Sequence, residues 1–260
     1  MSASPFDELA AGYDASFTHT ELGRRYRRAV QRRMELRFAP GGRVLELNCG
    51  TGEDALALAR RGVSVLATDA SEAMLAEARA KLAGAGAQAA GRVELRRLSL
   101  EELAGAAADL GRFDGALSNF GGLNCTAELA GVAAGLAAAL RPGAPAILCV
   151  MGPTCPWEWA WRLAHPPHRD PFRRLRKGLT WRGLPVRYPS VGALRRVFRP
   201  QFRCDRVWAL GALLPPPCAE AWAARRPALV ERLDRLERRV EAAPGLAWLA
   251  DHYVVELSRR

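Results

Sequence analysis

The stretch that decides the fold starts at residue 44 and reads Val44-Leu45-Glu46-Leu47-Asn48-Cys49-Gly50-Thr51-Gly52-Glu53-Asp54. Its apolar start predicts a short buried strand, and Gly50-Thr51-Gly52 predicts a tight turn directly after it. A helix is expected from about Glu53 to Arg60, ending near Gly62. Asn48 precedes the turn, and asparagine takes a left-handed backbone conformation almost as well as glycine.

The same alternation of short apolar runs and longer amphipathic segments continues to residue 150. Further strands are expected over 63–68, 93–98, 113–118 and 146–150. Helices are expected from Asp69-Ala70-Ser71 to about Lys81 and over 126–139, with a loop at 83–91. Later segments suggest a strand over 201–214, a charged amphipathic helix over 218–242 and a final strand at about 252–258. The fold class is therefore α/β: a Rossmann-like, doubly wound, mostly parallel seven-stranded sheet with an antiparallel closing strand, plus helical and loop lid segments.

Composition limits the classes of protein that remain. The chain has 260 residues, 49% of them hydrophobic, which suits a single well-filled core. The longest charge-free stretch, 142–157, is too short and too rich in proline to span a membrane, and acids near the N-terminus argue against a signal peptide. Six isolated cysteines favour free thiols in a reducing cytoplasm over a disulfide or zinc scaffold.

The net charge of +11 is unevenly distributed. Residues 1–150 carry 17 basic and 17 acidic side chains, so the whole excess lies in 151–260, with 21 basic and 10 acidic side chains. Because 36 of the 38 basic residues are arginine, a GC-rich genome explains the excess at least as well as a phosphate-binding surface. Nucleic-acid binding is therefore an alternative and not the first expectation.

The charges around the turn indicate which ligand it suits. Gly50-x-Gly52-x-x-Ala55 alone also satisfies a dinucleotide-binding pattern. A diphosphate would sit at the start of the following helix, where Glu46, Glu53 and Asp54 would oppose it by about 1 kcal/mol each. These acids favour a ligand that carries cationic groups and no phosphate, such as S-adenosylmethionine.

The segment 44–52 resembles motif I of the class I S-adenosylmethionine-dependent methyltransferases, in particular the type 11 small-molecule group, with Asn48 where the family usually has glycine. The resemblance implies a single methyltransferase domain over 1–260: an N-terminal helical lid at 1–40, a cofactor-binding core at 41–151, and acceptor-lid insertions at 152–200 and 215–250. It also implies S-adenosylmethionine as cofactor and S-adenosylhomocysteine as product.

Site residues follow from that resemblance. Asp69 matches the acid that binds the ribose hydroxyls, and Ser99 stands where relatives have an aspartate for the adenine amine, although Ser99 suits a helix N-cap equally well. Tyr13 would reach the cofactor carboxylate, or else pack an amphipathic helix. The expected cofactor-binding set is Tyr13, Glu46, Asn48, Cys49, Gly50, Gly52, Asp69, Ala70, Met74, Leu98, Ser99, Asn119 and Phe120.

The expected acceptor is a small aromatic or anionic molecule, with oxygen as the favoured acceptor atom and nitrogen or carbon as the alternatives. Methyl transfer needs mainly positioning, and a base only where the acceptor must lose a proton. His19, His165 and His168 are the candidate bases or acceptor contacts, with an exposed loop as the alternative for each. No metal site is expected. An RNA methyltransferase that uses the basic C-terminal half, or a methyltransferase-like binding module without turnover, remain the alternative functions.

Overall fold

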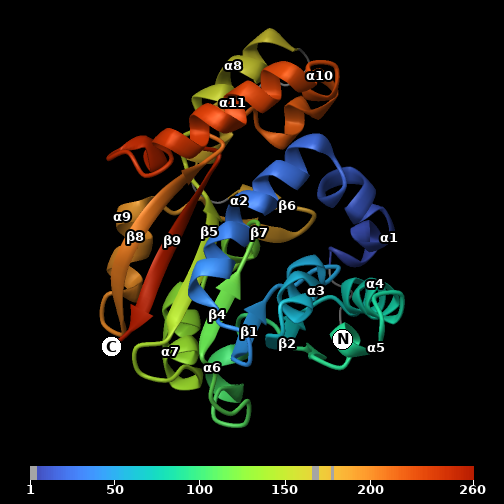
Figure 1. Cartoon of the computed structure of the whole chain (residues 1–260). Coiled ribbons are helices and arrows are strands. Elements are labelled where there is room, and N and C mark those ends of the chain that lie inside the picture. Colours follow the sequence, from blue (N-terminus) through green and yellow to red (C-terminus); the bar gives the residue numbers. More distant parts are fainter. Residues whose placement is uncertain (1–4, 166–169, 177–178) are drawn as a thin grey trace.

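A seven-stranded sheet in the order β3-β2-β1-β4-β5-β9-β8 forms the centre of the computed structural model, which describes residues 5–165, 170–176 and 179–260 (Figure 1). The five parallel strands are β1 (Arg43–Leu47), β2 (Ser64–Asp69), β3 (Val93–Arg97), β4 (Gly115–Ser118) and β5 (Pro145–Met151). β9 (His252–Arg259) runs antiparallel to β5 and to β8 (Phe202–Leu210). The predicted fold class is confirmed.

Alternating side chains of the strands enter two separate apolar cores. On β1 and β5, Leu45, Leu47 and Leu148 face a core completed by α6 (Leu103–Ala106), α7 (Leu129–Ala139) and α9 (Val191–Phe198). Val44 and Ile147 face the other core, which is completed by α2 (Glu21–Arg37), α3 (Glu53–Arg60) and α4 (Glu72–Ala83). The sheet is therefore a buried middle layer between two helical layers.

The N-terminal segment consists of a 3₁₀ turn (Asp7–Leu9), α1 (Ala10–Tyr13), a π-helical turn (Asp14–Thr18) and then α2. Thr20 begins α2 as its N-cap, because its side chain accepts a hydrogen bond from the Gly23 amide at 3.0 Å. Residues 10–18 pack near α4 and α2, so the segment crosses the carboxyl ends of the central strands (Figure 1).

The segment 152–190, which has no clear periodicity in the sequence, contains α8 (Pro156–Ala164), a 3₁₀ turn (Arg173–Leu175) and a hairpin of β6 (Leu179–Trp181) and β7 (Leu184–Val186). Arg182 and Gly183 form the hairpin turn with φ of 48° and 83°.

Two segment predictions are wrong. The expected loop at 83–91 contains the short helix α5 (Ala87–Ala90). The expected single helix over 218–242 is divided into a 3₁₀ turn (Pro217–Ala219), α10 (Glu220–Ala224) and α11 (Pro227–Val240). The division falls at Pro227, which has no amide hydrogen to continue a helix and is favoured at a helix start.

None of the described helices combines the length and the apolar character that crossing a membrane requires.

Candidate functional site

A cavity of about 460 Å³ opens where the strand order of the sheet reverses, at the carboxyl ends of β1, β2 and β4. This is the place where doubly wound sheets bind their ligands. Eleven of the thirteen expected cofactor-binding residues line it: Tyr13, Glu46, Asn48, Cys49, Gly50, Asp69, Ala70, Met74, Leu98, Asn119 and Phe120.

The turn after β1 is fixed to the end of β4 by one side chain. Asn48 has a left-handed backbone (φ 48°), as expected for this position. Its Nδ2 donates to the carbonyl of Asn119 at 2.9 Å, and its Oδ1 accepts from Ser118 Oγ at 2.7 Å. A Cβ on Gly122 would lie 2.0 Å from this amide group, so only glycine leaves room for the contact.

Asp69 ends β2 with both carboxylate oxygens facing backbone donors. Oδ2 accepts from the Gly50 amide and Oδ1 from the Ser71 amide, each at 2.9 Å. Burial raises the pKa of this carboxyl, and the backbone donors only partly offset the rise. Each oxygen keeps one further acceptor position, so Asp69 can receive a pair of hydroxyl groups.

Of the three acids expected around the turn, two are neutralised by cations. Glu53 pairs with Lys81 at 2.8 Å, and Asp54 forms a buried ion pair with Arg27. Asp54 also accepts from Asn119 Nδ2 at 2.8 Å. The sequence-based picture of three free acids is therefore wrong, because it did not include the cations that the fold brings to them.

Glu46 is the acid that stays unpaired. Its side chain is 2% exposed and lines the cavity, and no described residue gives its carboxylate a hydrogen bond. Burial, followed by repulsion from Asp54, raises its pKa well above the ordinary value. An unpaired buried carboxylate is costly, and a cationic ligand group would remove that cost.

Arg27 supplies the opposite charge to the same cavity. Its guanidinium lies 4.8 Å from the centre of the Phe120 ring, beside the ion pair with Asp54, and its Nε is buried without a hydrogen-bond partner. The cavity thus contains one unsatisfied carboxylate oxygen and one unsatisfied guanidinium donor. Together these complement a zwitterion, such as the amino-acid part of S-adenosylmethionine, so the residues present fit this cofactor.

Two expected cofactor residues do not line the cavity. Ser99 forms a reciprocal cap with Glu102, whose amide donates to Ser99 Oγ at 3.3 Å while Glu102 Oε2 accepts from the Ser99 amide at 2.8 Å. Gly52 has φ of 75° before α3, and a Cβ there would lie 3.0 Å from the Ala78 side chain. The geometry gives both residues a structural role.

The two candidate histidines that the structure describes do not line the cavity. His19 and His165 are exposed and lie outside the cavity lining, and His165 stacks on Trp161 at 3.8 Å. His168 lies outside the described residues. A different histidine is buried: His252, at the start of β9, has its Nδ1 2.9 Å from Asp251 Oδ2 and its ring 5.9 Å from that of Phe120.

The cavity is covered by two segments that are far apart in the sequence. Phe6 from the N-terminal segment and Trp181 from the β6–β7 hairpin both line it, with ring centres 5.3 Å apart. Beside them, Glu8 and Arg182 form an exposed ion pair. No described lining residue comes from 215–250, where α10 and α11 instead contact α2: Glu220 accepts the Glu21 and Leu22 amides at 2.8 and 2.9 Å.

Several lining residues were not singled out from the sequence. Arg27 is one of many arginines in α2, and only its place beside the buried Leu22–Tyr26–Val30 stripe distinguishes it. On the hairpin side, the described lining residues are mainly aromatic and apolar, with Thr180 and Arg173 as the polar ones. These residues are Met151, Arg173, Leu179, Thr180, Trp181, Leu184, Val186 and Tyr188.

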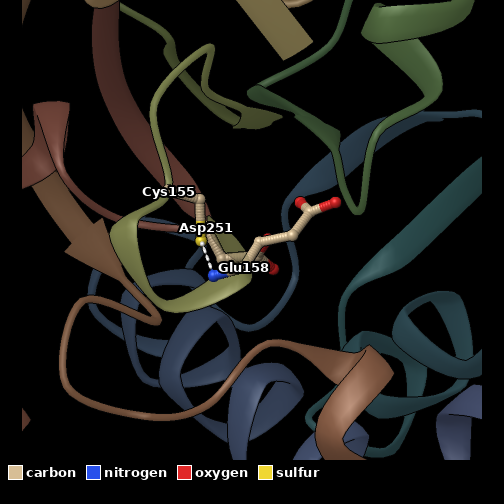
Figure 2. Close-up of side chains that lie close together, drawn as sticks. All are labelled: Cys155, Glu158 and Asp251. Carbon is tan, nitrogen blue, oxygen red and sulfur yellow. Dashed lines mark hydrogen bonds between the residues drawn. The ribbon is translucent and has the colours of Figure 1, made fainter. Parts of the chain in front are cut away.

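A second group of side chains has the composition of a metal site but is occupied by arginines. Figure 2 shows Cys155, Glu158 and Asp251 close together, with the Glu158 amide donating to Cys155 Sγ at 3.4 Å. Arg174 forms ion pairs with both Glu158 and Asp251. Burial raises the pKa of the Cys155 thiol to about 12. Arginine already neutralises both acids and the thiol stays protonated, so we do not propose a metal site here. The group links α8 to the start of β9.

Comparisons with known proteins identify relatives of the sequence and of the fold. Residues 44–143 match the family model described as a methyltransferase domain. A demethylmenaquinone methyltransferase of Beutenbergia cavernae is 34% identical over 161 residues, which cover 60% of this chain and 59% of that protein. The first curated relatives are matched over only 32 to 59% of their own length.

Solved structures share the fold across nearly the whole chain. An S-adenosylmethionine-dependent methyltransferase of Mesorhizobium loti has a TM-score of 0.57 and 22% identity, covering 90% of this chain and 98% of that one. One from Geobacter sulfurreducens, in complex with S-adenosyl-L-homocysteine, has a TM-score of 0.55 and 18% identity over 100% of both chains. Strand order and cavity position define the Rossmann-like methyltransferase fold. Residues 44–143 thus match a methyltransferase domain, and the whole chain has the fold of these S-adenosylmethionine-dependent methyltransferases.

Proposed function

We propose that this protein transfers a methyl group from S-adenosylmethionine to a small, planar and largely apolar acceptor. One observation carries the proposal: Glu46 and Arg27 bring an unpaired carboxylate oxygen and an unpaired Nε–H donor to one cavity, which Asp69 also lines. Glu46 and Arg27 would hold the ammonium and carboxylate of the amino-acid part, with Tyr13 beside them. Asp69 would accept the two ribose hydroxyls, and Met74 and Leu98 would pack against the adenine.

S-adenosylmethionine, when bound, supplies a methyl group already activated by the sulfonium. The chain therefore has mainly to bring the acceptor into line and keep water out. Phe6 and Trp181, in contact above the cavity, would exclude water. Among the described residues no histidine lines the cavity, so the proposal assigns no histidine base.

The hairpin side of the cavity supports the acceptor class. Trp181, Tyr188 and the aliphatic residues around them offer flat apolar walls. Arg173, whose Nε pairs with Glu158 at 2.9 Å, is the cation among the described residues of these walls. A hydroxylated aromatic ring would stack on these walls while Arg173 favours its phenolate. Oxygen is the acceptor atom that we propose. Demethylmenaquinol deserves the first assay, because the sequence relatives are named for demethylmenaquinone. NMR of the product would separate methylation at oxygen from methylation at a ring carbon.

We further propose a cytoplasmic location and a role in specialised metabolism. The six cysteines are all free thiols, which supports a reducing compartment.

Cofactor binding is tested by calorimetry with S-adenosylhomocysteine. Replacing Asp69 by alanine is expected to weaken binding at least tenfold, because two hydroxyl groups lose their acceptor inside a closed site. Asp109→Ala changes an exposed acid of the same type and should leave the affinity within twofold. Since Asp69 also holds the Gly50 and Ser71 amides, a melting curve accompanies the titration. Unchanged affinity in a folded Asp69→Ala protein would contradict the proposal.

Acceptor binding is tested at the hairpin. Trp181→Ala should raise the KM for an aromatic acceptor about tenfold while the affinity for S-adenosylhomocysteine changes less than threefold, because a stacking wall is worth roughly 1–1.5 kcal/mol. Trp248→Ala removes a tryptophan that is 63% exposed and outside the cavity, and is the matched control. Initial rates at saturating cofactor give the KM. A loss confined to cofactor affinity would place Trp181 outside the acceptor site.

A further inference from the structure

A second hollow, of about 470 Å³, lies at the opposite edge of the sheet, between α9, β8 and the last residues of β9 (Figure 1). It shares no lining residue with the cofactor cavity. The buried rings of Phe198 and Phe202 and the side chain of Leu257 form its floor. The hollow is therefore a separate feature of the molecule, and the inference drawn from it does not depend on the proposed methyl transfer.

Five arginines surround this hollow, and no acidic residue is part of its lining. They are Arg195, Arg196, Arg199, Arg203 and Arg260. Of these, Arg203 pairs with Asp205 at 2.9 Å. All five side chains are exposed, and within the described ranges the other four take part in no ion pair. Arg260 Nε donates to the Arg199 carbonyl at 3.2 Å.

Secondary structure explains the position of only two of these five arginines. Arg195 and Arg196 lie in the last turn of α9, where the helix dipole favours cations. Arg203 comes from β8 and Arg260 follows β9, so neither is placed by that helix end. Guanidinium groups from three elements converge on this hollow and repel one another. An anion bound between them would attract each of them and so offset the repulsion.

We propose that this hollow binds a small anion that carries two or more phosphate groups. Guanidinium groups present paired donors that match phosphate oxygens, and several of them around one hollow suit a multiply charged ligand better than a single carboxylate. The volume lies in the range of small-ligand sites. The apolar floor of Phe198, Phe202 and Leu257 leaves room for an organic part beside the phosphates.

Inorganic pyrophosphate is the probe, titrated calorimetrically into the full-length protein at about 50 mM salt, with S-adenosylhomocysteine absent and then at saturation. The variant Arg196→Gln/Arg199→Gln should weaken pyrophosphate binding at least tenfold. The control Arg225→Gln/Arg239→Gln removes the same net charge from exposed arginines that make no ion pair and lie outside the hollow. It should leave the affinity within twofold.

Saturation with S-adenosylhomocysteine should not displace pyrophosphate, because the two cavities share no residue. Absence of measurable pyrophosphate binding, or an equal loss in both double variants, would overturn the proposal. A single-stranded RNA of about 20 nucleotides tests the competing class of ligand. If RNA bound through Arg196 and Arg199 with a steep salt dependence and pyrophosphate failed to compete, the hollow would be a nucleic-acid surface and the proposal would be wrong.

Discussion

Replacing Arg174 by methionine is expected to lower the free energy of unfolding by about 3 kcal/mol, because it removes a buried cation that two carboxylates share. Glu158 keeps Arg162 and Arg173 as partners, whereas Asp251 keeps His252. Arg174 is 6% exposed and forms ion pairs with Glu158 and Asp251, which are 1% exposed each. Burial alone would raise the pKa of Asp251, but Arg174 and His252 hold it well below its ordinary value. Urea unfolding followed by circular dichroism measures the change.

The pH dependence of that loss has a definite sign. An acid whose pKa is lowered by folding contributes stability that is present above its unfolded pKa, near 4, and is lost as the pH falls further. Without Arg174 the pKa of Asp251 rises, so the difference between the two proteins should narrow from pH 7 towards pH 4. Arg176→Met, which removes a neighbouring arginine paired only with Asp170, should cost less than about 1 kcal/mol. A loss below 1 kcal/mol for Arg174→Met would show that the buried acids find other partners.

Replacing Glu46 by glutamine should move cofactor binding and stability in opposite directions. The substitution keeps the shape and removes the charge, so the affinity for S-adenosylmethionine should fall at least tenfold as the ammonium loses its partner. The cofactor-free protein should become more stable, because an unpaired buried carboxylate is gone. Burial raises the pKa of Glu46 well above the ordinary value, and such an acid costs stability above its unfolded pKa. The gain should therefore grow from pH 5 to pH 8.

Calorimetry and melting curves of the cofactor-free protein at both pH values measure the two effects. Glu94→Gln, an exposed acid on β3, should change neither. If Glu46→Gln lowered stability together with affinity, Glu46 would be a structural residue and the zwitterion argument for the cavity would fail.

Much of the fold is predictable from the sequence because four of the parallel strands, β1, β2, β4 and β5, are largely buried. Runs such as Val44–Leu47 and 146–150 are apolar on both faces except at Glu46, so their length and their flanking turns identify them as strands. The errors came from helices. The Ala-rich residues 87–90 form a helix despite glycines on both sides, and Pro227 divides what the charge periodicity joins. In both places the local conformational preference of the backbone decided the structure, and not the composition or the charge periodicity of the segment.

The site is predictable where it is local in sequence. The residues at the ends of β1, β2 and β4 follow directly from their strands, so Glu46, Asp69 and Asn119 could be assigned to one cavity. Contributions from segments that are distant in the sequence could not be assigned to the cavity in this way. The ion pair of Arg27 with Asp54 and the contact of Trp181 with Phe6 depend on how helices and the hairpin cross the sheet. His19 and His165 lie outside the cavity lining, and their residue type alone does not indicate where the fold places them.

The side-chain amide of Asn48 is hydrogen-bonded to Ser118 and Asn119, so it links the loop after β1 to the loop after β4. The turn after β1 lines the cavity together with Phe120, which has φ of 49° and stands just beyond β4. The methyltransferase family that the sequence resembles usually has glycine at this position. Glycine has no side-chain amide to form these hydrogen bonds, so the two loops could then shift independently. Here they form one rigid unit, so a ligand that displaces either loop must also displace the other.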